Sequence, residues 1–409
     1  MSRVLAYTSP ARGHLFPLTP ILDELHGRGH EISLRTLSSQ VGLMRDRGFE
    51  AAAVDPAVEA IEHQDWRARS AQAALRSSVQ TFCARAEHDA PDLRRAIEEE
   101  RPDLLIVDIQ SWGALAVAEA WGGPWAAFCP YPLPLPSRDA PPFGPGLPPA
   151  GGTLGRLRDA ALRPLVFGTV ERVVVRRLNE LRAGLGLGPV DATEMFTRPP
   201  LLLYMTAEPF EYPRSDWPAN VRLVGPCAWD PPAEPPDWLA EVTRPLVLVT
   251  TSSEFQDDGR LVQTAITALA DEDVEVIATL PAAAVARFDA PANARVLPFV
   301  PHAPLLERAA CAITHGGMGA TQKAIARGVP VCAVPFGRDQ LEVARRVEVS
   351  GAGTRLAARR LEPGRLRAKV REAMTLRPGA ERIAAAFEAT GGPTAAAAAI
   401  EQQLAGLER

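Results

Sequence analysis

The sequence predicts an α/β protein of two domains, each built around a parallel β-sheet. Its 409 residues exceed one ordinary hydrophobic core and suit two domains of about 200 residues each. Short apolar runs alternate with helical patterns along the chain, which is typical of βαβ units. A proline-dense segment at residues 226–236 interrupts the alternation. Together these observations predict two Rossmann-like domains joined by a linker.

Several strand patterns stand out in each half of the chain. In the first half they are residues 4–8, 31–35, 103–108, 125–128 and 201–205, and in the second half residues 246–250, 275–279, 295–299, 311–314 and 331–334. They divide the chain into a first domain at 1–215, a linker region at 216–240, a second domain at 241–385 and an Ala-rich C-terminal helix at 386–409. Ligands of open α/β sheets bind beyond the carboxyl ends of strands, so the residues that end these runs are the first site candidates.

Two segments of the first half match neither strands nor buried helices. The tract at 130–149 is too rich in proline for a helix or an inner strand. It follows a strand end, so it is either a mobile lip over a ligand cleft or an irregular surface loop. Residues 157–187 form arginine-rich amphipathic helices, which predict a solvated helix pair over the cleft, with membrane docking as the alternative.

Composition excludes several function classes. A net charge of −5 and a pI near 5.9 give no electrostatic case for nucleic-acid binding. No apolar run approaches the roughly 20 residues that span a bilayer, and the first residues have a strand pattern instead of a signal peptide, so we expect a cytoplasmic protein. The cysteines are odd in number and widely spaced, which predicts reduced core residues: Cys83, Cys129, Cys227, Cys311 and Cys332.

A glycine turn in the second half is the strongest motif. The apolar run ending at Thr314 is followed by His315-Gly316-Gly317 and then by residues 318–327 of helical composition. Glycine lets the backbone approach a ligand, and the free N–H groups at a helix start form an anion site suited to a diphosphate. By itself this turn is equally compatible with glycines that serve packing only.

The turn belongs to a longer spaced set. The segment 299–304 (Phe-Val-Pro-His-Ala-Pro) precedes it, and Gly328-Val-Pro330 and 335–340 (Pro-Phe-Gly-Arg-Asp-Gln) follow it. This set resembles the C-terminal signature of the family 1 glycosyltransferases, and the resemblance extends over essentially the full chain. It is closest to the actinobacterial macrolide and antibiotic branch of that family.

The resemblance implies a fold and an activity. The fold would be GT-B, with two Rossmann-like domains facing across a cleft and a C-terminal helix that crosses back to the first domain. The activity would be metal-independent, inverting transfer of a hexose from a UDP- or dTDP-sugar to a small lipophilic aglycone, with no cofactor other than the donor. Partners would be the donor and the acceptor, with a homodimer as a further possibility.

The resemblance also assigns donor contacts. His315, Gly316, Gly317, Gly319 and Thr321 would hold the diphosphate, with the hydroxyl of Ser253 in the loop at 250–255. The remaining contacts would be Phe299, Val300 and His302 at the nucleotide base, and Asp339 and Gln340 at the sugar hydroxyls.

His14 and Asp108 are the catalytic candidates. His14 lies between the first strand pattern and the first helical pattern, and Asp108 closes a strand pattern that should end at the same sheet edge. Glycosyl transfer needs a base that is neutral near pH 7, which imidazole provides, and a carboxylate would orient it. A His-Asp pair is also what the family uses at the matching positions. The alternative is that His14 only starts a helix and Asp108 only caps one.

No metal site is predicted. His26, His30, His63 and His88 are not interpreted as metal ligands, and no Asp-x-Asp follows a strand. The leaving diphosphate would therefore be neutralised by protein groups alone.

Two positions depart from the family pattern. Ser252 stands where glycine is common, so its side chain either crowds the donor or points away. Lys323 stands where a glutamate often accepts the ribose hydroxyls of UDP-sugars. Either the donor is a dTDP-deoxysugar or Lys323 is a solvated helix residue with recognition elsewhere, and the donor sugar stays open between glucose and a deoxyhexose.

Two other functions compete with sugar transfer. A GT-B nucleotide-sugar epimerase shares the domain layout, and a non-catalytic homologue that activates a partner transferase is suggested by Ser252 and Lys323. The acceptor cleft itself is only loosely defined by the sequence. Its possible aromatic walls are Trp66, Trp112, Phe128 and Tyr131.

Overall fold

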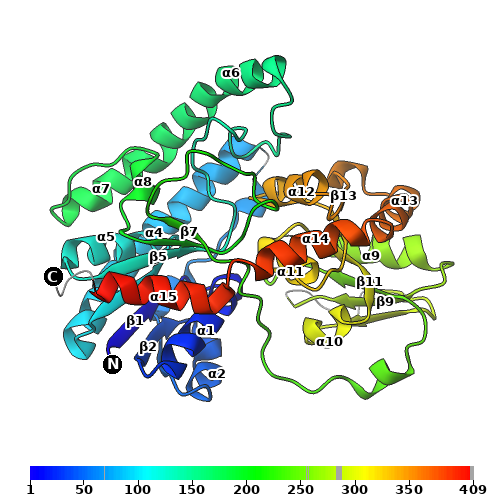
Figure 1. Cartoon of the computed structure of the whole chain (residues 1–409), viewed down its shortest axis with the longest axis horizontal. Coiled ribbons are helices and arrows are strands. Elements are labelled where there is room, and N and C mark those ends of the chain that lie inside the picture. The colour runs from blue at the N-terminus through cyan, green and yellow to red at the C-terminus, as the bar shows by residue number, and fades with distance from the viewer. Residues whose placement is uncertain (69, 255, 257, 282–287, 406–409) are drawn as a thin grey trace.

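The computed structural model has two lobes, each built on one parallel sheet (Figure 1). It describes residues 1–68, 70–254, 256, 258–281 and 288–405. The first sheet has the strand order β3-β2-β1-β4-β5-β6-β7, and the second has the order β10-β9-β8-β11-β12-β13. Every strand pairing is parallel, which confirms the predicted pair of Rossmann-like units.

The first lobe is formed by the following elements, in chain order: β1 (Arg3–Tyr7), α1 (Arg12–Gly27), β2 (Glu31–Thr36), η1 (Ser38–Gln40), α2 (Val41–Arg45), β3 (Glu50–Ala53), α3 (Pro56–Ala60), η2 (Asp65–Arg67), α4 (Ala71–Glu100), β4 (Leu104–Asp108), α5 (Trp112–Trp121), β5 (Trp125–Cys129), α6 (Thr153–Val170), the π-helical turn η3 (Glu171–Val175), α7 (Arg176–Gly184), α8 (Glu194–Thr197), β6 (Leu202–Tyr204) and β7 (Val221–Leu223).

The second lobe and the C-terminal segment follow: η4 (Asp237–Glu241), β8 (Leu246–Thr250), α9 (Gly259–Leu269), β9 (Glu275–Thr279), β10 (Ala294–Leu297), α10 (His302–Leu306), β11 (Ala309–Thr314), α11 (Met318–Ile325), β12 (Val331–Ala333), α12 (Gln340–Val349), β13 (Gly353–Arg355), η6 (Ala358–Arg360), α13 (Pro363–Met374), α14 (Arg377–Glu388) and α15 (Gly392–Ala405).

Alternating side chains of the central strands fill the two faces of each sheet. In β1, Val4 and Ala6 belong to the core cluster that includes α1 residues, whereas Leu5 and Tyr7 belong to the cluster on the opposite face. All four are fully buried, so β1 reads as a continuous apolar run, as expected for an inner parallel strand. β1 pairs with β4, and this register brings the ends of both strands to one edge of the sheet.

Three short strands were not predicted: β3, β7 and β13. Each is a short edge strand of its sheet, too short to stand out in the sequence. β7 extends the first sheet to Leu223, inside the segment expected to be linker. We therefore extend the proposed first domain through β7.

The predicted return of the C-terminal helix is confirmed. α15 lies on the first lobe in Figure 1, where Ala396, Ala397 and Ile400 join the core cluster of α1. Glu401 accepts a hydrogen bond from the Arg28 guanidinium at 2.7 Å and lies 3.2 Å from His30 Nε2. The chain thus passes between the lobes at the linker and again before α15.

The proline-rich tract after β5 is anchored to the second lobe. It contains neither helix nor strand between Cys129 and Thr153. The backbone N–H groups of Gly144 and Gly146 donate to Glu342 Oε1 of α12, at 2.7 and 2.9 Å. Arg345 of the same helix donates to the carbonyl of Gly146. The tract is therefore a strap between the lobes in this structure.

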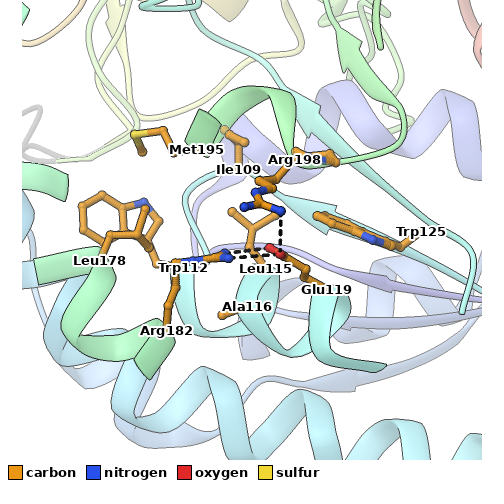
Figure 2. A pocket seen from close by; sticks show the side chains of 11 residues that line it. Ile109, Trp112, Leu115, Ala116, Glu119, Trp125, Leu178, Arg182, Met195 and Arg198 are labelled. Atoms are coloured by element: carbon orange, nitrogen blue, oxygen red, sulfur yellow. Dashed lines mark hydrogen bonds and ion pairs between the residues drawn. The ribbon is translucent and has the colours of Figure 1, made fainter. Parts of the chain in front are cut away.

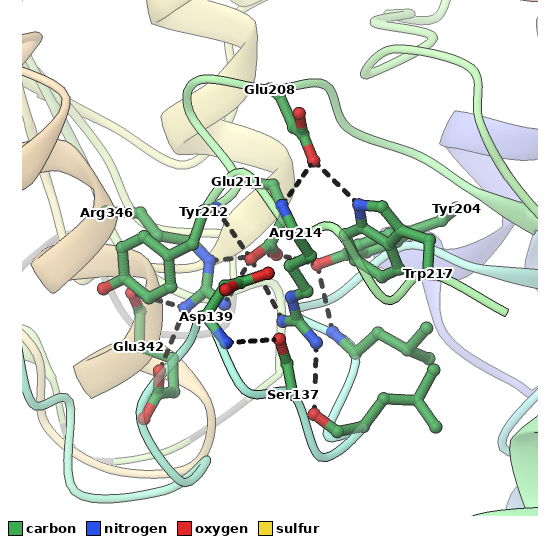
Figure 3. A network of polar contacts seen from close by, with 12 residues as sticks. Ser137, Asp139, Tyr204, Glu208, Glu211, Tyr212, Arg214, Trp217, Glu342 and Arg346 are labelled. Atoms are coloured by element: carbon green, nitrogen blue, oxygen red, sulfur yellow. Dashed lines mark hydrogen bonds and ion pairs between the residues drawn. The ribbon is translucent and has the colours of Figure 1, made fainter. Parts of the chain in front are cut away.

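A buried ionic network lies beside the strap (Figure 3). Arg346 of α12 is fully buried and donates to both carboxylate oxygens of Glu211, at 3.0 and 2.8 Å, and to Glu342 at 2.9 Å. Glu211 lies in the connection between β6 and β7, and Phe210 beside it enters the core of the second lobe. The network therefore joins the two lobes through charges removed from water.

The helix pair after the strap consists of α6 and α7, and α6 exposes several apolar side chains. Leu154, Leu157 and Leu165 of α6 are exposed, with 83%, 61% and 67% of their surface accessible. Among the described residues, no helix is long and apolar enough to cross a bilayer.

Candidate active site

His14 and Asp108 meet at the carboxyl edge of the first sheet. His14 lies in the first turn of α1, and Asp108 is the last residue of β4. His14 Nδ1 is 2.8 Å from Asp108 Oδ2. A carboxylate at this distance accepts a hydrogen bond from Nδ1–H, so the neutral ring has Nε2 as its basic atom.

The Asp108 carboxylate is fixed by several donors. Its Oδ2 accepts from the backbone N–H and the hydroxyl of Ser9, at 3.0 and 2.8 Å, and its Oδ1 accepts from the N–H of Gln110 at 2.9 Å. Burial alone would raise the pKa of Asp108, but the charge of His14 and these hydrogen bonds hold it below its ordinary value. The carboxylate is therefore ionised and oriented.

The environment of His14 acts on its pKa in two directions. Burial of the ring opposes the charged form, whereas the carboxylates of Asp108, Glu254 and Asp339 favour it, and the net effect raises the pKa. Only 14% of the His14 side chain is exposed. The ring of Tyr131 lies 6.0 Å away, centroid to centroid.

The glycine turn between β11 and α11 is the candidate anion site. Gly316 has φ +88°, in the left-handed region that favours glycine, and Gly317 is the N-cap of α11. The His315 ring lies against Gly317, and burial lowers the pKa of His315, so the ring is neutral near pH 7. Thr321 is fully buried and hydrogen-bonded to Thr314 at 3.0 Å, so it supports the turn from inside.

Gly317→Ala should abolish nucleotide binding, whereas Gly364→Ala in α13 should not. A Cβ at position 317 would lie 2.3 Å from His315 Nε2, and at position 364 it would meet no atom within 4 Å. Gly364 is exposed and lies within a helix, where alanine is favourable. Thermal shifts with UDP and dTDP measure the difference, and equal shifts for both variants would contradict the anion site.

The predicted base pocket is only partly accessible. Phe299 is 51% exposed, as a stacking platform must be, whereas Val300 is buried. His302 Nε2 is 3.0 Å from the Thr279 hydroxyl, and burial lowers the pKa of His302 to about 4. His302 is therefore a neutral group near pH 7.

Lys323 is not a solvated helix residue. Its ammonium lies 2.5 Å from Asp230 of the linker, and the two side chains are only 14% and 12% exposed. The positive charge is thus engaged by a carboxylate from outside the second sheet.

The loop after β8 uses Ser252 in its own hydrogen bonds. Its hydroxyl accepts from the backbone N–H of Glu254, and its own N–H donates to Asp258. Ser252 is buried in its loop, whereas Ser253 is exposed and available to a ligand. Phe255, also in the predicted loop, lies outside the described residues.

Asp339 and Gln340 differ in their availability. Gln340 is buried, accepts from the N–H groups of Phe336 and Gly337, and donates to Gln256, so its amide holds the turn together. Asp339 has no side-chain hydrogen bond to another described residue, and burial raises its pKa. Of the two, Asp339 is the group with free acceptor capacity.

The aromatic residues suggested as acceptor walls divide into two groups. Phe128 is fully buried in the core, so it lines no cleft. Trp112 borders a cavity of about 30 Å³ beside the ion pair of Arg182 and Glu119 (Figure 2). A space of this size holds about one water and no aglycone. Tyr131, beside His14, and Trp66, which is 36% exposed, stay as candidates.

Comparison with known proteins supplies the family. The model of the erythromycin biosynthesis protein CIII-like C-terminal domain matches residues 263–403. The 4'-demethylrebeccamycin synthase of Lentzea aerocolonigenes is 36% identical over 386 residues, which cover 90% of this chain and 91% of that protein. The chain belongs to the natural-product glycosyltransferases.

Other relatives of this glycosyltransferase agree in fold or sequence. A rhamnosyltransferase of PGL/p-HBAD biosynthesis from Mycobacterium bovis BCG is 32% identical over 314 residues, covering 72% of this chain and 65% of that protein. The calicheamicin glycosyltransferase CalG4 superposes with a TM-score of 0.75 at 21% identity, covering 99% of this chain and 98% of its own. Glycosyltransferase VinC, solved with dTDP, gives 0.71 at 24% identity, covering 98% and 99%. The GT-B fold is thereby confirmed.

The structure adds groups to the glycosyltransferase site that the sequence did not reveal. Ser9 orients Asp108, and Arg338 binds Asp65 of the first lobe and Glu254 of the second. The Ser9 position two residues beyond a strand was a usable signal. Nothing in the sequence links Asp65 to Arg338. Among the described residues, no group of three or more His, Cys, Asp or Glu side chains could hold a metal ion.

Proposed function

We propose that this glycosyltransferase moves a hexose, with inversion and without a metal ion, from a UDP- or dTDP-sugar to a small lipophilic aglycone in the cytoplasm. The observation that carries the proposal is the contact between His14 Nδ1 and Asp108. It leaves His14 Nε2 as a base at the sheet edge, and the charges of Glu254 and Asp339 from the second lobe reach the same ring. A base placed between an acceptor lobe and a donor lobe fits transfer better than binding alone.

The proposed reaction is a single displacement. Nε2 takes the proton of the acceptor hydroxyl while its oxygen forms a bond to the anomeric carbon. The bond from that carbon to the diphosphate oxygen breaks on the opposite face, so an α-linked donor gives a β-glycoside. Asp108 stabilises the imidazolium that forms, which is the usual role of a buried carboxylate beside a catalytic histidine.

Departure of the diphosphate depends on dipoles and neutral donors. The N–H groups at the start of α11 and the partial positive charge of that helix favour the developing anion. His315 would donate a hydrogen bond as a neutral ring, and Ser253 would add its exposed hydroxyl. Gly316, Gly317 and Gly319 would allow close approach of the backbone. This set supports a leaving-group site built from protein groups alone.

The nucleotide of the proposed donor is either UDP or dTDP. Relatives include a protein named UDP-glycosyltransferase 2 and a rhamnosyltransferase, at 31% and 32% identity. The ammonium of Lys323 cannot accept a hydrogen bond from ribose, which favours dTDP. Asp339 would accept from a sugar hydroxyl. Gln340 would do so only after releasing Phe336 and Gly337.

Thermal unfolding across concentration series of UDP, dTDP, UDP-glucose and dTDP-glucose tests the donor site. A ligand that binds only the folded state adds about 2.7 kcal/mol at about 100 times its Kd. We expect stabilisation by one nucleotide class, then β-glycoside formation by NMR when an aglycone is added. No shift with any of the four would remove the proposal. Conversion of the donor without acceptor would favour an epimerase, and activation of a separate transferase would favour a non-catalytic partner.

A further inference from the structure

We propose that Arg338 is a positioning residue that ties the donor-sugar turn of the second lobe to the first lobe and keeps water from attacking the donor. The inference rests on the proposed function and adds a control of the partition between transfer and hydrolysis. Its basis is an ion-paired triad of Asp65, Arg338 and Glu254 that joins the two lobes.

The Arg338 guanidinium binds two carboxylates, one from each lobe. Its Nε lies 3.2 and 3.1 Å from the two carboxylate oxygens of Asp65, and its Nη2 lies 2.9 Å from Asp65 Oδ1. Its Nη1 donates to Glu254 Oε2 at 2.7 Å. Asp65 is only 5% exposed and belongs to η2 of the first lobe, whereas Glu254 follows β8 of the second lobe. Bidentate contacts of this kind fix orientation as well as distance.

The backbone of Arg338 is strained. Its φ is +54°, in the left-handed region, which a residue with a Cβ adopts only at an energetic cost. The next residue is Asp339, the proposed sugar ligand. The two carboxylates that hold the guanidinium therefore also hold the turn that aims Asp339. Loss of the ionic contacts should let the turn relax.

The triad lies beside the proposed base. Glu254 and Asp339 act on the charge of His14, together with Asp108 of β4, and Tyr131 packs near the ring. The Arg338 guanidinium in turn favours the ionised forms of Glu254 and Asp339, although burial opposes them. Removing its charge leaves two carboxylates uncompensated near the imidazole.

A second basic group and a second histidine also face this region. Arg85 of α4 interacts electrostatically with Glu254 and Asp108. His63 Nε2 lies 3.6 Å from Asp65 Oδ1, and burial together with Arg338 lowers the pKa of His63. The segment around Asp65 is thus held by Arg338 on one side and by its own lobe on the other, as expected of a wall that closes against the donor turn.

Closure matters chemically because water competes with the aglycone. In hydrolysis, a water oxygen forms the bond to the anomeric carbon, the bond to the diphosphate oxygen breaks, and the products are free sugar, nucleoside diphosphate and a proton. A site that excludes water suppresses this reaction. Loss of the contact between Arg338 and Asp65 should therefore increase hydrolysis relative to transfer.

Arg338→Gln and Asp65→Asn test the inference separately. In both variants we expect the ratio of free sugar to glycoside to rise by about tenfold or more, with a higher acceptor KM, because the same contact is broken from either lobe. Arg338→Gln should also move the acidic limb of the kcat/KM profile to higher pH, because Glu254 then favours imidazolium more strongly. Asp65→Asn keeps shape and leaves the turn sequence unchanged, so it covers the case in which the arginine variant fails to fold.

Arg371→Gln is the matched control. Arg371 pairs with Glu272 on the surface of the second lobe, is 64% exposed, and should leave the partition unchanged. Wild-type partition and pH profile in both Arg338→Gln and Asp65→Asn would overturn the inference. If the wild-type protein neither transfers nor hydrolyses a donor, the proposed function fails instead, so the two failures are distinguishable.

Discussion

Replacing His14 by alanine is expected to lower kcat by about 10²- to 10⁴-fold while the protein stays folded. The alanine removes Nε2, the proposed acceptor of the aglycone proton, while Asp108 keeps its hydrogen bonds from Ser9 and Gln110. Donor stabilisation in thermal unfolding should persist, because the glycine turn lies on the other lobe. Initial rates with saturating donor and acceptor give the measurement.

Asp108→Asn is a second test of the same pair, and His26→Ala is the control. The asparagine variant loses the carboxylate that orients Nδ1, so it should lose a large part of the same activity. His26 is an exposed histidine on α1 and should be dispensable. Turnover in His14→Ala equal to that of His26→Ala would eliminate His14 as the base and favour a non-catalytic role.

The pH dependence follows from the raised pKa of His14. The base must be neutral to accept a proton, so activity should appear as pH rises through a pKa above 6.5. The same shift has the opposite effect on stability: a raised pKa stabilises the fold below the unfolded value of 6.5 and loses this contribution as pH rises through the folded value. A kcat/KM profile between about pH 5 and 9 covers the window.

Replacing Arg346 by alanine is expected to cost about 3–5 kcal/mol of unfolding free energy. Glu211 and Glu342 lose their common cation while they stay buried, and Arg346 also stacks on Tyr212 at 4.4 Å from the ring centroid. Denaturant titration measures the loss. Arg365→Ala, which removes an exposed pair with Glu362, should cost at most about 1 kcal/mol.

The pH dependence of stability should also differ between the wild type and Arg346→Ala. Burial would raise the pKa of Glu211, but Arg346 and Arg214 hold it below 4.5, so in the wild type its contribution is present above that value and is lost as pH falls through the folded pKa. In Arg346→Ala the main cation is gone and burial dominates. The variant should then recover stability as pH falls from 7 toward about 5, since Glu211 can take up a proton. A deficit independent of pH would contradict this account.

The fold could be predicted further than the site. Inner strands such as β1, β4 and β8 carry apolar runs because both faces of the strand are buried. Their own sequences are therefore nearly sufficient to predict them. β3 and β7 are short and depend on a neighbouring strand, so only the assembled sheet identifies them.

Site residues divide in the same way. His14, Asp108 and Gly317 lie at strand ends or after them, so the parallel topology alone brings them to the carboxyl edges of the sheets. Arg338 and Asp65 meet because the two lobes pack against each other. No local sequence pattern predicts how the lobes pack. Gln340 shows the converse: its position matched a motif, but its amide is used within its own turn. Its contact with the sugar stays a prediction.

The return of α15 to the first lobe has a consequence for biosynthesis of the chain. Because Ala396, Ala397 and Ile400 complete the core around α1, the first lobe cannot finish packing until α15, which follows the second lobe, has been synthesised. Domains usually fold as they emerge, amino-terminal part first. Here the second lobe, whose sheet is formed by one continuous segment, can close while the first still has an uncovered helix surface. In this respect the second lobe is an insertion within the first lobe. The first lobe is complete only when α15 has been synthesised and has packed against it.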